Sequence, residues 1–466
     1  VAEPIDGVTG AYVYQNQDLV TGSGGFPYAL PFSRTYLSSS GSNLTTTTAD
    51  RGLGNGWAHA YSASAQTQSD PYSAMGSSDS PAVSSVTSIA ALYVMQDLLS
   101  ITPTAQTMTI SSMVARWFTD QLTSNVVMVS QPNTTEEFIA QPHADGATSF
   151  VFTPPPGSSV RFMQTAAGQF TYTRKDGVTQ TFGPLAGQPA SALLSWTYPF
   201  GASISLTYTG SQLAQVANNF GRRLTFSYSG ADISGVTDDT GRSVAYSYDG
   251  NHNLIGFVDP LGSRTTYSYG GVYDALGHLT QIYYPFEPGT PFLTNWYDQL
   301  GRVVQQANAN GNSSRFYFAG SRTEVDDPIG NRQVTYQTDR GKILSDAVVL
   351  DNSAIGNVYN DTPQQNGVVN VTHFQYDGID RLTTIILPEG GTKALTYATA
   401  VNPWANNIAS IVDTPKPGSP LSPRTASFTY DPFFNKTTSI TDPMGLVTTM
   451  AYDSATGNLL SIVADS

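Results

Sequence analysis

The chain has 466 residues, of which only 12% are charged, and its 35 acidic and 21 basic side chains give a formal net charge of −14. A composition with little charge, 42 glycines and 26 tyrosines favours strands and turns over long helices. The acid excess argues against nucleic acid as a partner, because it repels phosphate backbones.

The absence of cysteine leaves no disulfide framework and no thiolate metal site. It fits a bacterial protein that crosses envelopes unfolded or lives outside the cell, although cytosolic proteins can lack cysteine too. The chain starts at Val1 with no basic and apolar leader, so we interpret its start as processed or trimmed. No window reaches the roughly 18 uncharged apolar residues of a membrane span. We expect a secreted or cell-surface protein without such a span.

Residues 1–75 are predicted to form antiparallel strands, because short alternating or aromatic runs end in Gly, Pro or Ser. In FSRTYLS, Arg34 lies between Phe32 and Tyr36, which indicates a partly buried structural cation and not a catalytic one. His59, in GWAHAYS, follows a similar strand pattern, and we interpret it as a packed or edge histidine.

Residues 76–124 break this pattern, and we predict a helical hairpin inserted in the β protein. Pro81 follows a Ser/Asp cap signal, and apolar residues recur at helical spacing from 86 to 95 and again from 110 to 122. Two interpretations stay open. The hairpin is either a lid packed on neighbouring strands or a docking and self-assembly element.

Strands resume over residues 125–195, where a Lys-Asp-Gly turn marks a hairpin, and residues 196–466 then form one repeat array. Longer gaps in the repeat hold turn-rich insertions such as PFEPGTP, which belong on loops at one edge of a stacked array. Tyrosines mark the repeat, about twenty residues apart where no insertion intervenes, at Tyr208, Tyr228, Tyr248, Tyr269, Tyr297, Tyr317, Tyr336, Tyr376, Tyr397, Tyr430 and Tyr452.

Each repeat is predicted to be a strand, a turn and a strand. The Asp after the Tyr, as in YDGNHNLIGFV, accepts hydrogen bonds from the turn it opens, and where Gly follows that Asp it supplies a positive φ. A second turn, DPLG, DPIG or DPMG, places Pro where its fixed φ helps and Gly where freedom is needed. One unit cannot bury its apolar face alone, so consecutive units must stack into a continuous sheet. The turn residues singled out are Tyr248, Asp249, Asp259, Pro260, Gly262, Tyr273, Asp274, Gly277, Tyr297, Asp298, Gly301, Arg302, Asp327, Pro328, Gly330, Tyr376, Asp377, Tyr452 and Asp453.

The YD-x-x-G-x-L units with their DP-x-G turns resemble the YD repeats of the rearrangement-hotspot (Rhs) family, shared with the shell components of insecticidal toxin complexes and with teneurins. FSRTY and GNGWAHAY are similar to the region that precedes the repeats in bacterial members. The resemblance implies a mainly β fold whose hairpins spiral into a full or partial hollow shell. In toxin members, such a shell encloses a C-terminal toxic domain.

The resemblance also implies one catalytic candidate, Asp442, because some members cut themselves at a DPxGL segment that closes the repeat region. Here DPMGL is followed by another ordinary repeat. The five histidines show no metal spacing, and HExxH, GxSxG and P-loop motifs are missing from the sequence. The acid pairs Asp238–Asp239 and Asp326–Asp327 sit in repeat turns, which explains them without catalysis. We expect no enzyme activity, no cofactor and no metal, with calcium and sugar binding left open.

Two structural functions follow. The first is a non-enzymatic shell that encloses or carries a protein cargo such as a C-terminal toxin domain. The alternative is an extracellular filament or adhesion subunit that associates with itself through exposed strand edges and the helical hairpin. A third hypothesis, a glycan-active enzyme, needs two carboxylates facing each other in a cleft.

Overall fold

The computed structural model describes residues 4–38, 52–67, 92–102, 104–109, 126–141, 148–270, 277–338, 340–349 and 369–465, which are mostly antiparallel strands. The mainly β fold class is confirmed. Helical residues are few, and within the described part of the chain no helix is long and apolar enough to cross a membrane.

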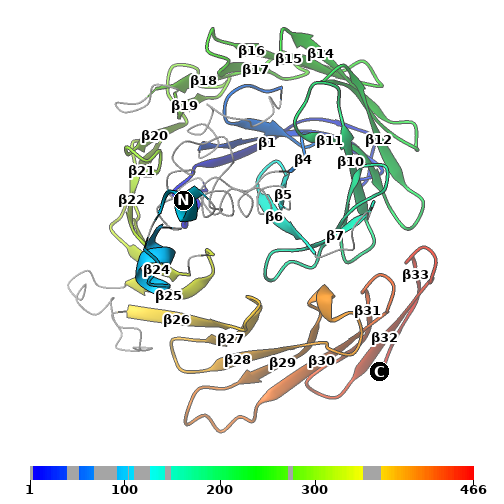
Figure 1. Cartoon of the computed structure of the whole chain (residues 1–466), viewed down its shortest axis with the longest axis vertical. Coiled ribbons are helices and arrows are strands. Elements are labelled where there is room, and N and C mark those ends of the chain that lie inside the picture. The colour runs from blue at the N-terminus through cyan, green and yellow to red at the C-terminus, as the bar shows by residue number, and fades with distance from the viewer. Residues whose placement is uncertain are drawn as a thin grey trace.

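The first strands form a small sheet of their own, in the order β1 (Val13–Thr21), β2 (Leu30–Leu37) and β3 (Trp57–His59). Figure 1 shows this sheet inside the curve made by the other strands. Because side chains alternate along a strand, Phe32, Arg34 and Tyr36 share one face of β2, and all three are buried. That face is turned toward the repeat array.

The next strands close on themselves. They are β4 (Ser64–Thr67), β5 (Val126–Ser130), β6 (Thr135–Ala140), β7 (Phe150–Thr153), β8 (Arg161–Gln164), β9 (Phe170–Thr173), β10 (Thr179–Pro184) and β11 (Ser191–Thr197). Each pairs with the next, and Ser64 and Ala65 of β4 pair with Ala192 and Ser191 of β11 to complete a ring. The other end of β11 pairs with the first repeat strand, so the ring and the array share this strand.

From β11 onward, every strand pairs antiparallel with its successor, and the array curves through the green, yellow and red parts of Figure 1. The first part comprises β12 (Ser203–Thr209), β13 (Gln212–Asn218), β14 (Arg223–Ser229), β15 (Asp232–Asp238), β16 (Ser243–Tyr248), β17 (Leu254–Val258), β18 (Arg264–Tyr269), β19 (Leu279–Tyr283), β20 (Leu293–Tyr297), β21 (Val303–Asn308), β22 (Ser313–Ala319), β23 (Arg322–Asp326), β24 (Arg332–Gln337) and β25 (Ile343–Val349). The second part comprises β26 (Val369–Tyr376), β27 (Leu382–Ile386), β28 (Thr392–Tyr397), β29 (Ile408–Thr414), β30 (Arg424–Tyr430), β31 (Thr437–Thr441), β32 (Val447–Tyr452) and β33 (Leu459–Ala464).

The C-terminal part of the array comes back to the ring. The short 3-10 helix η3 (Pro403–Ala405) carries Trp404, whose indole ring lies 4.8 Å from the guanidinium of Arg161 on β8. Lys175, in the turn between β9 and β10, donates to the side chain of Asn407 at 3.2 Å, and its backbone carbonyl accepts from Asn435 at 2.8 Å. These contacts close the curved wall on itself through side chains.

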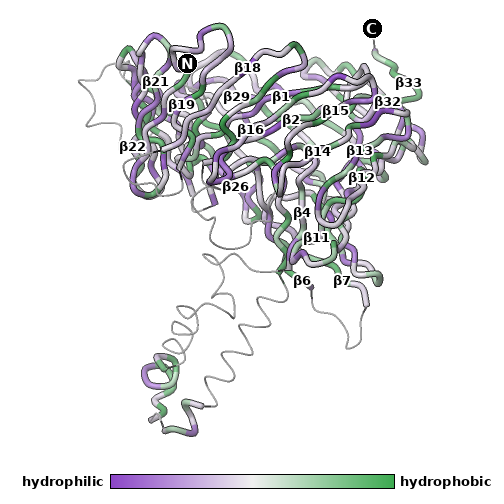
Figure 2. The backbone as a smooth tube through the Cα atoms, turned by 90° about the horizontal axis from the view of Figure 1, so that it is seen from above, coloured by the Kyte–Doolittle hydropathy of each residue, from purple (hydrophilic) through white to green (hydrophobic). Residues whose placement is uncertain are grey.

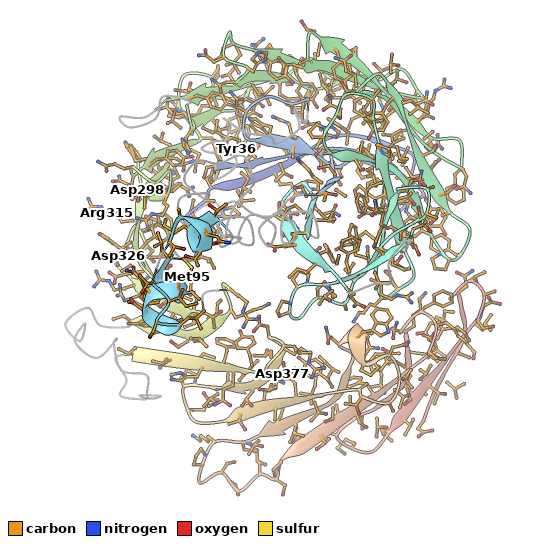
Figure 3. All side chains as sticks on the ribbon, viewed as in Figure 1. Tyr36, Met95, Asp298, Arg315, Asp326 and Asp377 are labelled. Atoms are coloured by element: carbon orange, nitrogen blue, oxygen red, sulfur yellow. The ribbon has the colours of Figure 1, made fainter. Side chains whose placement is uncertain are left out.

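Strand residues alternate between an apolar inner face and a polar outer face. On β16, Tyr246 is buried while Ser243 and Ala245 are exposed, the pattern of a sheet covered on one side. Figure 3 shows Tyr36 inside the curve and Asp298 and Arg315 at its outer side.

The predicted helical hairpin is described only at residues 92–102 and 104–109, and the rest of residues 76–124 lies outside the described residues. Within it, η1 (Val94–Leu98) is a short π-helix, and residues 105–109 are helical. Figure 2 shows η1 well away from the strands, so this part is not a lid packed on them. Leu98 and Leu99 are 66% and 59% exposed.

Candidate functional site

The repeat tyrosines tie each unit to the one before it. The hydroxyl of Tyr269 donates to the backbone carbonyl of Leu254 at 2.8 Å, fifteen residues earlier. Burial raises the pKa of Tyr269 well above its usual value, so the hydroxyl stays protonated and remains a donor. The same bond, 2.8–3.0 Å long, is made by Tyr208, Tyr228, Tyr248, Tyr297, Tyr376, Tyr397 and Tyr430 to carbonyls of earlier strands.

Tyr317 and Tyr336, which the spacing also selected, lie differently from these tyrosines. Tyr317 is 44% exposed and pairs across the strands with Glu324, while its neighbour Phe318 packs against the core cluster. On β24, the buried position is held by Gln337, 4% exposed, and not by Tyr336. The spacing could not separate these cases, because β22 carries aromatic residues on both faces and the tyrosine of β24 lies one residue before the equivalent position.

The aspartates build the turns as predicted. In DPLG, one carboxylate oxygen of Asp259 accepts from the backbone N–H of Leu261 at 2.8 Å and of Ser263 at 2.9 Å. Gly262 has a φ of +87°, which a side chain would strain. Asp298, Asp327 and Asp377 accept the same pair of backbone bonds in their own turns.

These bonds stabilise the charged carboxylates. Desolvation raises the pKa of Asp327, but hydrogen bonds from the side chain and backbone of Asn331 outweigh it, and the net pKa lies below its usual value. For Asp453, the bond from the Thr456 hydroxyl lowers the pKa.

The sequence predicted that in the YDG turns the glycine after Asp has the positive φ, and this prediction is wrong. The positive φ falls on His252 and Asp380, both at +62°, while Gly250 and Gly378 keep ordinary backbone angles. The left-handed residue is the fourth of the turn, the place of Gly262 in DPLG, and His and Asp tolerate this conformation better than bulkier residues do.

The other singled-out residues take structural roles. Pro260 and Pro328 follow their turn aspartates, Gly277, Gly301 and Gly330 have φ between +74° and +90°, and Arg302 bonds Asp298 at 2.7 Å. Asp453 accepts from the N–H of Ala455 and Thr456, and Tyr452 lies 5.6 Å from the ammonium of Lys436. Tyr273 and Asp274 lie outside the described residues.

Asp442, the self-cleavage candidate, has the same geometry as the other turns. One of its carboxylate oxygens accepts from the N–H of Met444 at 2.8 Å and of Leu446 at 2.9 Å. Gly445 has a φ of +86°. The geometry therefore gives Asp442 a turn-forming role like that of Asp259.

A buried cation joins the N-terminal sheet to the array. Arg34 is fully buried, more than the sequence predicted, and its Nε donates to both carboxylate oxygens of Asp18 at 2.7 and 3.0 Å. The Tyr246 hydroxyl donates to the same carboxylate at 2.6 Å. The terminal guanidinium nitrogens have no hydrogen-bond acceptor among the described residues. They are surrounded instead by aromatic rings 4.3–5.9 Å away, those of Trp57, Tyr246, Phe257 and Tyr267.

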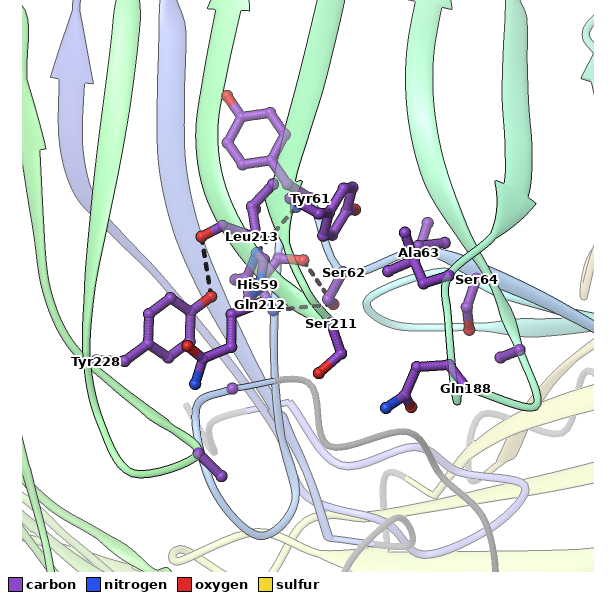
Figure 4. A pocket seen from close by; sticks show the side chains of 16 residues that line it. His59, Tyr61, Ser62, Ala63, Ser64, Gln188, Ser211, Gln212, Leu213 and Tyr228 are labelled. Atoms are coloured by element: carbon purple, nitrogen blue, oxygen red, sulfur yellow. Dashed lines mark hydrogen bonds between the residues drawn. The ribbon is translucent and has the colours of Figure 1, made fainter.

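A pocket lies where the ring, the N-terminal sheet and the first repeats meet (Figure 4). His59 lines it, with its ring 5.4 Å from Phe32 and 6.0 Å from Phe226, and its Nδ1 accepts from the backbone N–H of Tyr61 at 3.2 Å. The prediction of a packed histidine is confirmed. Among the described residues, no three His, Asp or Glu side chains gather as a metal ion requires.

The inner face of the array is covered in one part and open in another. Phe32 packs on Phe226 of β14, with ring centroids 5.5 Å apart, and Val236 beside it is fully buried. The cross-strand pair Phe428↔Ile440 continues this inner row on β30 and β31, and there Ile440 is 36% exposed. Ile462 of β33 is 60% exposed. Sequence periodicity finds this apolar row but does not show which part is covered.

The structure thus defines a curved wall of YD-type hairpins with an internal N-terminal sheet. Residues 2–79 match a family described as a domain of unknown function, DUF6531. A comparison with curated proteins finds no match.

Among solved structures, the chain is similar to the Photorhabdus luminescens Tc holotoxin pore, at 11% identity and a TM-score of 0.41, over 76% of this chain and 22% of that one. It is also similar to TcdB2-TccC3, at 13% identity and a TM-score of 0.33, over 77% and 18% of the two chains. A third similar structure is TcdB2-TccC3 without its hypervariable C-terminal region, at 10% identity and a TM-score of 0.33; the match covers 97% of this chain and 21% of that one. The chain spans about a fifth of the length of these structures.

Proposed function

We propose that the chain is a non-enzymatic, secreted wall segment of an Rhs-like YD-repeat shell, and that it encloses or carries a protein cargo. The observation that carries the proposal is the apolar row on the inner face of β28–β33, which is half-buried on β28–β30 and reaches 36% exposure at Ile440 and 60% at Ile462. Apolar side chains at the same inner positions of β14–β16 are buried under the N-terminal sheet. An exposed apolar face inside a curved wall is suited to hold an extended or unfolded polypeptide.

The mechanism would be mechanical. Tyrosine bonds and turn aspartates make each hairpin rigid against its neighbour, and the inner row supplies non-directional apolar contact that does not depend on the sequence of the cargo. The wall would separate the cargo from solvent and proteases without chemical change.

The test attaches an unstructured passenger polypeptide after Ser466 and measures its survival under limited proteolysis. We expect a longer lifetime than that of the free passenger, and loss of this protection in Ile440→Asp, which places a charge on the inner row. Ser439→Asp is the matched control, because its side chain points to the opposite face. A passenger digested as fast as the free polypeptide would overturn the proposal.

The second candidate is an extracellular filament or adhesion subunit. Among the described pairings, β33 pairs with β32 alone, and its Leu460, Ile462 and Val463 are each at least 60% exposed. A strand with an unpaired edge and apolar side chains on both faces is a template for a further strand. Electron microscopy of the purified chain separates the two functions, because polymers joined end to end favour the filament and discrete particles favour the carrier.

A further inference from the structure

One described part of the chain stands apart from the β structure. Residues 92–102 and 104–109, which we call the hairpin tip, contain η1 and the helical residues 105–109, and Figure 2 shows them well away from the strands. The backbone of the tip is bonded within itself, since Leu99 donates to the Val94 carbonyl at 3.0 Å and Met108 to the Thr104 carbonyl at 2.9 Å. The tip is therefore a locally folded projection.

The hairpin tip presents most of its large apolar side chains to solvent. Those that are 40–66% exposed are Tyr93, Val94, Leu98, Leu99, Ile101 and Met108. Met95, at 6% exposure, is the buried one among the described residues of the tip. A helical segment normally turns such side chains toward a core, and here none of the described strands covers them. An apolar cluster that the fold leaves open indicates a contact surface.

The hydroxyl groups of the tip are bonded inside it. Thr104 and Thr107 bond each other reciprocally, because the N–H of Thr104 donates to the Thr107 hydroxyl at 2.8 Å and the N–H of Thr107 donates to the Thr104 hydroxyl at 3.1 Å. The Thr109 hydroxyl donates to the Ala105 carbonyl at 2.8 Å. Polar groups that are already bonded cost less to remove from water, so the tip can enter an apolar medium without leaving these groups unpaired.

Charge and shape favour a lipid surface as the occupant. Asp97 is the only Asp, Glu, Lys or Arg residue from 92 to 109, whereas a protein interface surrounds its apolar centre with a polar rim. An acyl layer requires apolar side chains and no matching charge, and Tyr93 suits its boundary, where tyrosine is enriched. A bilayer is also flat, so a projecting part of the molecule reaches it first. The net charge of −14 gives no attraction to anionic lipids.

We propose that the hairpin tip inserts into the interface of a lipid bilayer with uncharged or zwitterionic headgroups, and that Leu98 and Leu99 are its main anchors. The tip lies in the surface layer and does not span the membrane. This contact is separate from the inner face of the array, so it holds whether or not the chain carries cargo. It brings the curved wall to a membrane and leaves the strands in water.

The first experiment places an environment-sensitive fluorophore on the tip. The chain has no cysteine, so Leu99→Cys can be labelled alone, and Leu261→Cys is the control because Leu261 is 92% exposed in a turn of the array. Phosphatidylcholine vesicles should shift the emission of the label at 99 to the blue and leave that at 261 unchanged. No shift at 99, or equal shifts at both positions, overturns the proposal. A shift that appears without vesicles as the protein concentration rises also overturns it, because it assigns the tip to a second copy of the chain.

The second experiment measures co-sedimentation of the whole chain with the same vesicles. Replacing both anchors, Leu98→Asn with Leu99→Asn, should weaken binding about a hundredfold, since two leucine side chains no longer leave water. The matched control is Leu261→Asn with Leu300→Asn, two exposed leucines in turns of the array, and should bind as the wild type does. Equal losses in the two variants, or no loss in the tip variant, contradict insertion of the tip. Binding that requires phosphatidylserine and disappears at high salt contradicts it as well, because it identifies an electrostatic contact.

Discussion

The buried Arg34 gives the sharpest test of how the N-terminal sheet is held against the array. Replacing it by methionine, Arg34→Met, keeps the apolar stem but removes the charge. Asp18, whose side chain is fully buried, then lacks its counter-ion. Burial, and next to it the Asp18 charge, raise the pKa of Tyr246 well above its usual value, so this hydroxyl continues to donate and only partly compensates.

The magnitude follows from the contacts. Removing one partner of a buried ion pair costs about 3–5 kcal/mol, because an uncompensated charge remains. Each of the four aromatic rings within 4.3–5.9 Å of the guanidinium adds about 0.5 kcal/mol or more of cation–π attraction. We expect Arg34→Met to lower the free energy of unfolding by about 5 kcal/mol.

The assay is urea unfolding followed by tryptophan fluorescence, to which Trp57 contributes from 5.1 Å above the guanidinium. The control is the triple variant Arg34→Met, Asp18→Leu and Tyr246→Phe, which replaces the buried ion pair and its tyrosine donor by apolar groups. It should recover most of the lost stability, because no buried charge is left without a counter-ion; the Asn16 amide, which loses its bond to Asp18, is only partly buried. A loss below about 1 kcal/mol in Arg34→Met, the size of an ordinary substitution, refutes the reasoning, as does a triple variant less stable than the single one.

Three further predictions concern the repeat. Tyr269→Phe should lower the free energy of unfolding by about 1–3 kcal/mol, because the Leu254 carbonyl loses its donor and the Trp57 indole N–H loses its acceptor. Tyr317→Phe should change it by less than about 0.5 kcal/mol; urea unfolding measures both. Asp327→Ala should destabilise the protein at neutral pH and Asp327→Asn much less, since an amide oxygen can still accept both turn bonds. The pKa of Asp327 is lowered in the folded state. Its charge therefore stabilises the fold above the unfolded pKa, and this stabilisation is lost as the pH falls through the folded pKa. In Asp327→Asn, the free energy of unfolding should accordingly fall less steeply as the pH is lowered. Gly262→Ala should cost about 1–2 kcal/mol, because φ is +87° there, and thermal unfolding would register it.

The turns were predictable because their physics is local. The bonds of Asp259 reach only two and four residues along the chain, so the letters DPLG contain all the partners. The positive φ at His252 was missed for a related reason, since the YDG sequence offers a glycine at a place where the turn does not need one.

The joint between sheet and array was not predictable in this way. Tyr246 bonds Asp18 from 228 residues away, and no short pattern links the two positions. The sequence indicated a structural role for Arg34 from its aromatic neighbours on one strand. The rings that surround it come mostly from repeats whose own periodicity requires apolar inner residues regardless of Arg34.

The wall is held by two kinds of contact, and the difference bears on how it works. The first kind of contact is local: in a repeat array each unit contacts its neighbours, and the twist between neighbouring hairpins sets the curvature. In the first part, the N-terminal segment joins distant units: Asn55 donates to the carbonyl of Asn251 at 2.7 Å, and the Gly10 carbonyl accepts from Val303 at 2.9 Å. Among the described residues, the second part returns to the ring through side-chain contacts such as those of Lys175, Asn407 and Asn435.

Side-chain hydrogen bonds of this kind each contribute about 0.5–1.5 kcal/mol, whereas separating two paired strands breaks a whole ladder at once. The contact between η3 and the β9–β10 turn is therefore weaker than a strand pairing. It adjoins β28–β31, whose inner apolar row is only partly covered. In the proposed carrier function, a wall that is rigid where its interior is filled and held by side-chain bonds where its interior is partly covered would admit or release a polypeptide without breaking a strand pair.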